Sequence, residues 1–138
     1  MRFCVIGLGK FGYSVAITLA DRGMEVIAID SDMGIVTTIK DKVTHAICMQ
    51  VTDEASLKSI GLEHVHTVII SIGDDFAQAV LTTVLCKRKL GIKHVITRTT
   101  TELKKEVLQL IGADQIIMPE QEIGIRLANA LSSSCDVK

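Results

Sequence analysis

A glycine-rich turn that follows an apolar segment most constrains how this chain of 138 residues folds. Residues 3–6 are all apolar, as in a strand buried on both faces. Gly7, Gly9 and Gly12 come next, in the pattern G-x-G-x-x-G. In a strand-turn-helix unit the first glycine permits a tight turn, the second lets a phosphate approach the backbone, and the third lets the helix pack closely against the strand. The spacing therefore predicts a strand followed by a helix whose N-terminus binds phosphate.

A second apolar segment, residues 26–29, ends in Asp30. This acid stands about 20 residues beyond the glycine pattern, the interval at which such units hold a carboxylate against a ribose hydroxyl. Glycines alone are a weak signal, because they also mark ordinary turns. Their place between a strand and a helix, with the acid at the end of the next strand, makes the signal specific. The sequence therefore predicts a nucleotide site.

The rest of the chain alternates apolar strand patterns with helical patterns. Because most strands are apolar throughout, we expect a Rossmann-like, doubly wound α/β fold with a parallel sheet of order 3-2-1-4-5-6 and helices on both faces. One domain is expected over residues 1–131, with residues 132–138 as a disordered tail or the start of a missing C-terminal subdomain. Further strands are predicted at 45–49, 67–72, 95–97 and 116–118, and helices at 13–22, 33–42, 76–90, 101–112 and 120–131, with a short helix ending at Gly61.

This strand order puts a switch point between the first and fourth strands, where ligands bind beyond the strand ends. Arg98, at the end of the fifth strand, either meets a phosphate there or forms an ordinary surface ion pair. The other residues predicted to contact the ligand follow the strand ends: Gly7, Leu8, Gly9, Lys10, Phe11 and Gly12; Asp30, Ser31 and Asp32; Gln50, Val51 and Thr52; and Ser71, Ile72, Gly73 and Asp74.

Composition excludes several classes of protein. The net charge of -1 offers no basic surface for nucleic acid, and an aromatic content of 3% without Trp disfavours base stacking. The longest apolar segments have the length of strands, so we expect no membrane insertion and a cytoplasmic location. Cys4, Cys48, Cys86 and Cys135 lack the close pairing of a zinc or redox motif.

Four segments taken together resemble a known domain. They are G-L-G-K-F-G at 7–12, V-I-A-I-D at 26–30, V-T-D-E-A-S-L-K-S-I-G-L at 51–62 and I-G-A-D-Q-I-I-M-P-E-Q-E-I-G at 111–124. The chain resembles the RCK (regulator of K+ conductance) N-terminal domain of the Trk and Ktr potassium-uptake regulatory subunits, and is closest to the Ktr type. The resemblance implies a domain that is not an enzyme, binds ATP, ADP or NAD(H), forms dimers and an octameric ring, and gates an integral-membrane potassium-translocating subunit. Such subunits usually carry a second, C-terminal subdomain that this chain lacks. We expect an excised N-terminal domain, and the alternative is that a separate chain supplies the missing part.

The resemblance also assigns roles to residues. The glycine loop would hold phosphates and Asp30 the ribose. Lys10 stands where the family usually has an Arg that reaches a nucleotide phosphate, and Lys keeps the charge but loses the bidentate fork. Gln50 replaces an acid on the adenine side and is still able to bond an adenine edge. ATP or ADP is favoured as the ligand, with NAD(H) as the alternative.

Glu120 matches an acid associated with a divalent cation, Mg²⁺ or Ca²⁺, at the dimer interface of Ktr-type subunits. One carboxylate is a poor metal site, so phosphates and a second subunit would have to supply the other ligands. The alternative is an acid that simply favours the start of a helix.

Two other functions stay open at this stage. An NAD-dependent dehydrogenase would need a proton donor or acceptor near the nicotinamide, and Ser71, Asp74, Asp75 and Arg98 lie near the strand ends. Paired acids that open a helix, however, are more often caps than catalysts. A purely structural oligomerisation module is the third class, because two of the predicted helices carry more apolar surface than one core face requires. These are the helix at 76–90, which Asp74 opens, and the helix at 120–131, and the surface includes Phe76, Val80, Leu81, Val84 and Leu85. That surface either packs on the sheet or forms a dimer contact.

Overall fold

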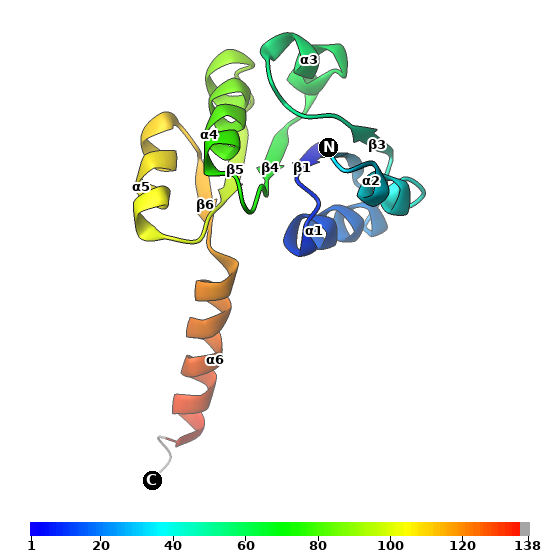
Figure 1. Ribbon diagram of the computed structural model, residues 1–138. Helices are drawn as coiled ribbons and strands as arrows, with labels where there is room; N and C mark the ends of the chain where they lie inside the picture. The colour runs from blue at the N-terminus through cyan, green and yellow to red at the C-terminus, as the bar shows by residue number, and fades with distance from the viewer. Residues whose placement is uncertain (136–138) are drawn as a thin grey trace.

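Six parallel strands form one sheet in the order β3-β2-β1-β4-β5-β6 in the computed structural model, which describes residues 1–135 (Figure 1). This confirms the predicted doubly wound topology. The strands are β1 (Arg2–Ile6), β2 (Glu25–Asp30), β3 (His45–Cys48), β4 (Thr67–Ile70), β5 (His94–Arg98) and β6 (Gln115–Ile117). The helices are α1 (Lys10–Asp21), α2 (Met33–Ile39), α3 (Glu54–Ser59), the 3-10 turn η1 (Leu62–His64), α4 (Phe76–Val84), the π turn η2 (Leu85–Lys89), α5 (Glu102–Ile111) and α6 (Pro119–Cys135).

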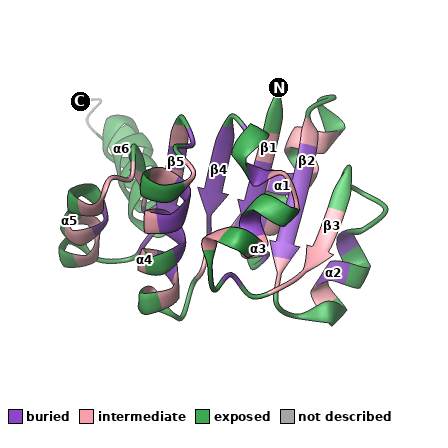
Figure 2. Ribbon diagram, turned by 90° about the horizontal axis from the view of Figure 1, so that it is seen from above, coloured by how far each residue is buried: buried purple, intermediate pink, exposed green. Residues whose placement is uncertain are grey.

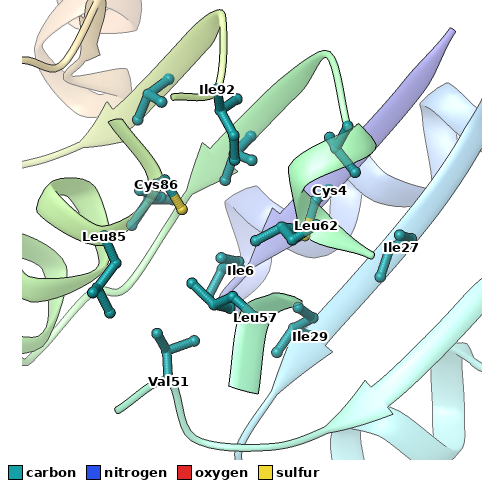
Figure 3. Packing of buried hydrophobic residues seen from close by; sticks show 14 residues of the cluster. Cys4, Ile6, Ile27, Ile29, Val51, Leu57, Leu62, Leu85, Cys86 and Ile92 are labelled. Carbon is teal, nitrogen blue, oxygen red and sulfur yellow. The ribbon is translucent and has the colours of Figure 1, made fainter. Parts of the chain in front are cut away.

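Two apolar layers cover the two faces of this sheet. Side chains alternate along each strand, so neighbouring residues of β1 belong to different layers: Cys4 and Ile6 to one, Val5 to the other. The first layer includes residues of α3, η1 and η2, and Figure 3 shows how they surround the strands. The second is completed by α1 and α2. Burial is deepest in β1, β2 and β4, as Figure 2 shows, and these strands bring the glycine loop and Asp30 to one edge of the sheet.

Several element boundaries differ from the sequence predictions. The second helix ends at Ile39 and not near residue 42, and the fourth strand ends at Ile70 and not at 72. The helix predicted over 76–90 is α4 followed by η2, because the Leu90 N–H bonds to the Leu85 carbonyl, five residues back, and widens the last turn. Asp75, and not Asp74, caps α4.

Helix α6 departs from the body of the sheet (Figure 1). None of its residues is buried, although the sequence gives it an apolar side that includes Ile123, Leu127 and Leu131. From residue 132 the sequence predicted a disordered tail or the start of a missing subdomain, and in the structure α6 continues to Cys135. Residues 136–138 of that predicted tail lie outside the described residues. No helix among residues 1–135 has the length and apolarity needed to cross a bilayer.

Candidate nucleotide-binding site

A cavity of about 820 Å³ opens at the carboxyl ends of the strands. This volume is within the usual range of small-molecule sites, roughly 300–1,000 Å³. Predicted residues that line it are Gly7, Leu8, Gly9, Lys10, Phe11, Asp30, Ser31, Gln50, Val51, Ser71, Ile72, Gly73, Asp74, Arg98 and Glu120. Three predicted residues, Gly12, Asp32 and Thr52, do not line it. Sequence reasoning missed Ile6, Ser14, Ile29, Ile35, Met49 and Gln78 as part of the lining, and it placed Asp75 near the strand ends only as a candidate catalytic group or helix cap.

Two glycines of the loop are required by the fold itself. Gly7 has a φ of 97°, and a Cβ there would lie 2.3 Å from the carbonyl oxygen of Ser71 in the neighbouring strand segment. At Gly12, a Cβ would lie 2.0 Å from the Gly7 carbonyl oxygen. Gly12 therefore brings α1 close to the strand-to-helix turn without lining the cavity.

Gly9 has no such requirement. Its φ of -70° and ψ of -170° are ordinary for any residue, and a Cβ would meet no atom within 4 Å. Gly9 nevertheless lines the cavity and is the N-cap of α1, where no side chain caps the helix and the first turn carries no acid. The exposed amide groups and the helix dipole there favour an anion. A bulky, negatively charged group such as a phosphate thus fits the space that Gly9 leaves open.

Asp30 holds the glycine loop in place. One of its carboxylate oxygens accepts a hydrogen bond from the Leu8 N–H and the other from the Asp32 N–H, both at 2.8 Å. Each oxygen keeps a second lone pair that is able to accept a ribose hydroxyl. Asp32 itself is not part of the cavity lining and caps α2 by accepting from the Gly34 N–H at 2.8 Å.

The segment after β3 forms another part of the lining. Gln50 is exposed there, and Val51 is buried. The side chain of Gln78 on α4 donates a 2.5 Å hydrogen bond to the Val51 carbonyl oxygen and so joins α4 to this segment. Thr52 instead contacts Asp53, the cap of α3. The only sequence signal for Gln78 was its position one turn into a helix that begins at the strand edge.

The acids after β4 differ in role. The Asp75 carboxylate accepts from the Gln78 N–H at 3.0 Å, which is the hydrogen bond of a helix cap. Asp74 lines the cavity beside it. Ser71 is buried, and its N–H donates to the Ile6 carbonyl oxygen at 2.8 Å. These contacts fix the backbone on the far side of the glycine loop.

Arg98 and Glu120 form an ion pair at the end of the cavity. The Arg98 Nη2 and Glu120 Oε2 atoms are 2.8 Å apart. A hydrogen bond from the Glu120 backbone and, secondly, the charge of Arg98 lower the pKa of the Glu120 carboxyl. No group of three or more His, Cys, Asp or Glu side chains capable of holding a metal is present among residues 1–135. Glu120 alone therefore offers a cation one carboxylate.

The parallel doubly wound sheet, the glycine loop and the cavity at the switch point define a Rossmann-type ligand-binding domain. The family model described as the TrkA-N domain matches residues 3–119, and the chain belongs to this family. The resemblance to Trk and Ktr subunits is thereby confirmed.

The chain is similar to Ktr system potassium uptake protein C of Bacillus subtilis, with 36% identity over 96% of this chain and 59% of the relative. It is 38% identical to Ktr system potassium uptake protein A of Vibrio alginolyticus, over 94% of this chain and 59% of the relative. The chain thus spans about three fifths of the length of the curated relatives that it matches.

Solved structures share the fold. The TrkA-N domain of inner membrane protein ybaL from Escherichia coli superposes with a TM-score of 0.84 at 18% identity, over 94% of this chain and 96% of that one. The GsuK channel bound to NAD superposes with a TM-score of 0.80 at 20% identity, over 96% of this chain and 23% of that one. GsuK bound to ADP superposes with a TM-score of 0.79 at 20% identity, over 96% of this chain and 34% of that one. The Shewanella denitrificans Kef CTD in AMP-bound form superposes with a TM-score of 0.76 at 17% identity, over 99% of this chain and 84% of that one.

Proposed function

We propose that this domain binds an adenine nucleotide in the cavity, with its phosphates at the glycine loop and its ribose at Asp30. Gly9 is the observation that carries the proposal, because the fold does not need a glycine there and a phosphate does. ATP or ADP is the favoured ligand, since Lys10 adds a positive charge to the helix N-terminus. NAD(H) is the alternative. Structures of the same fold bound to NAD, ADP and AMP support an adenine nucleotide of either kind.

The domain acts, in this proposal, as a regulatory part of a potassium-uptake system and not as an enzyme. Support comes from the relatives of the chain, which are potassium uptake proteins. The nucleotide would bind two arrangements of a dimer with different affinity and so shift their populations. Within a ring of dimers, this shift would gate an integral-membrane potassium-translocating subunit from its cytoplasmic side. Nucleotide binding that saturates without turnover in a steady-state assay distinguishes this function from that of a dehydrogenase.

A second copy of the chain is the proposed partner of α6. Ile123, Leu127 and Leu131 recur every four residues along this helix and are all more than half exposed. Such a stripe is self-complementary in a symmetric pair. Leu127→Glu should therefore weaken self-association in sedimentation velocity, whereas Ser133→Glu, a charge added outside the stripe, should not. Equal association of both variants would exclude this surface.

Glu120 is proposed to bind a divalent cation only together with a nucleotide phosphate and a second subunit. A single carboxylate does not satisfy Mg²⁺ or Ca²⁺, each of which needs six or more oxygen ligands in most sites. Glu120 would also have to leave Arg98, with which it pairs at 2.8 Å. The cation would neutralise phosphate charge where two subunits meet.

Calorimetric titration with ATP, ADP, NAD and NADH, with and without magnesium, tests the proposed binding. Gly9→Asp should abolish binding through its bulk and its charge, while the melting profile without ligand stays recognisable. Gly124→Asp is the matched control, because it adds the same side chain at another glycine with no atom within 4 Å of the new Cβ, outside the cavity. Unchanged affinity in the Gly9 variant would refute the site. Failure of the full-length subunit carrying Gly9→Asp to support potassium uptake would extend the result to the regulatory role.

A further inference from the structure

The parts of the cavity follow one another along the sheet edge. Asp30 ends β2, the glycine loop follows β1, Ser71 follows β4, and Arg98 ends β5. In the strand order these are consecutive neighbours, so Arg98 lies three strand spacings from Asp30, about 14 Å. If the ribose and first phosphate bind as proposed above, the distal end of the ligand points along the edge towards Arg98.

Arg98 is held in this position from several sides. Its side chain is only 17% exposed, and its Nη1 atom lies 3.7 Å from where a Cβ of Gly73 would be. The Nε atom is buried and has no hydrogen-bond partner in the part of the chain that the structure describes. A largely covered guanidinium with one unused, buried donor favours an anion that offers more acceptors than one carboxylate oxygen.

Glu120 is the weakly held member of the pair. Its side chain is 72% exposed, and an ion pair with so exposed a member typically changes an equilibrium constant by about fivefold or less. A phosphate offers the guanidinium two or more charged acceptors in bidentate geometry. An anionic group at this end of the cavity should therefore displace Glu120 from Arg98.

Displacement of Glu120 affects which ligands the cavity binds, because the lining that the structure describes carries few other positive charges. Within the described residues the lining contains two cations, Lys10 and Arg98, and only Lys10 is without an ion pair. A ligand with a single phosphate needs no more than the helix N-terminus and Lys10. A ligand with further phosphates gains affinity from Arg98 only when the ion pair between Arg98 and Glu120 breaks.

We propose that Arg98 selects nucleotides that carry a distal phosphate and that Glu120 is its built-in competitor. The inference rests on the proposed function and deepens it by assigning specificity at the same site. Glu120 belongs to the first turn of α6, so the exchange of partners also breaks the ion pair that links α6 to the cavity. Glu122, whose carboxylate accepts from the Met118 N–H at 2.9 Å, keeps the start of the helix attached. The charge of the ligand is thereby communicated to α6.

Titration with ATP and AMP in EDTA, at constant ionic strength, tests the competition without metal. Glu120→Gln should tighten ATP binding about two- to fivefold and leave AMP binding within twofold. Arg98→Gln should weaken ATP binding tenfold or more, because a charged hydrogen bond is lost, and affect AMP much less. In the Arg98→Gln background, Glu120→Gln should have no further effect on ATP. Lys10→Gln is the matched control, since it should weaken both ligands and preserve the effect of Glu120→Gln.

The outcomes separate this inference from the proposed function. An ATP-to-AMP affinity ratio that neither Glu120→Gln nor Arg98→Gln changes would overturn the competition and leave nucleotide binding intact. Weaker ATP binding by Glu120→Gln in EDTA would overturn it as well. Failure of the unaltered protein to bind either nucleotide would overturn both. Should Arg98→Gln not fold, as judged by its melting profile, the single variant at the exposed Glu120 still decides.

Discussion

The helices of the sheet body bury part of their large apolar side chains, whereas helix α6 buries none. In the body, Leu57, Leu85 and Leu108 are buried, although Leu103 and Leu110 of α5 are exposed. The large apolar residues of α6 are all more than half exposed. Both regions showed the same helical periodicity in the sequence. Helical periodicity therefore predicts which face of a helix is apolar, but it does not predict what covers that face. The sheet buries the inner faces of the body helices, whereas nothing in the described part of the chain buries the apolar face of α6.

The largest effect should come from Gly12, where the body is packed most closely. A Cβ there would lie 2.0 Å from the Gly7 carbonyl oxygen, and both are main-chain positions that cannot move independently. Gly12→Ala should destabilise the protein by about 4 kcal/mol or more, or prevent folding. Chemical denaturation monitored by circular dichroism measures this. Gly9→Ala, in the same loop but with open space around the new Cβ, should cost about 1 kcal/mol at most.

These glycines show why much of the fold and part of the site were predictable. The strand order and the glycine loop depend on local signals, namely apolar segments, turn residues and short helices in alternation. The pairing of Arg98 with Glu120 did not follow from the sequence, because the two residues belong to different elements and lie 22 positions apart in the chain. The hydrogen bond from the Leu8 N–H to Asp30 was missed for a different reason: a ribose ligand and an anchor for the loop both require an acid at this position.

Replacing one leucine in the core and one in α6 tests directly how much each region contributes to stability. Leu108→Ala removes a side chain with no exposed surface and should lower the free energy of unfolding by about 2–5 kcal/mol. Leu127→Ala removes the same atoms from a side chain that is 58% exposed and should change it by about 0.5 kcal/mol or less in dilute solution. Urea denaturation of both variants at low protein concentration gives the two values. Similar losses would mean that α6 packs on its own body.

Asp114 lies directly before β6, and the effect of replacing it should be intermediate. Its carboxylate accepts from Lys87 of η2 at 2.9 Å and from the Val95 N–H at 2.8 Å, which joins the π turn to the last strands. Partial burial raises the pKa of Asp114, but the hydrogen bonds from Lys87 and Val95 and the nearby charges outweigh it, so the pKa is lowered. A lowered folded-state pKa means stability that is complete above about pH 4 and lost as the pH falls further.

Asp114→Asn should therefore cost about 1 kcal/mol at pH 7 and progressively less below pH 4. Thermal unfolding of both proteins between pH 2.5 and 7 measures this difference. Asp53→Asn, at a helix cap whose carboxyl pKa is also lowered, provides a comparison outside the η2 network. A constant gap between the unaltered protein and Asp114→Asn across this range would contradict a charge-dependent role.

Removal of residues 126–138 should have the smallest effect on the stability of the isolated body. It tests most clearly whether α6 is covered by a second copy of the chain. The truncation keeps Glu120, Glu122 and the first turn of α6, so the contacts with Arg98 and Met118 remain. In dilute solution the free energy of unfolding should change by about 0.5 kcal/mol or less, because no residue of α6 is buried in the single chain. If a second copy covers the apolar stripe, the melting temperature of the full chain should rise with protein concentration and that of the truncated chain should not. A truncated chain that is less stable at every concentration would instead show that the body depends on α6, and the two regions would then form one cooperative unit.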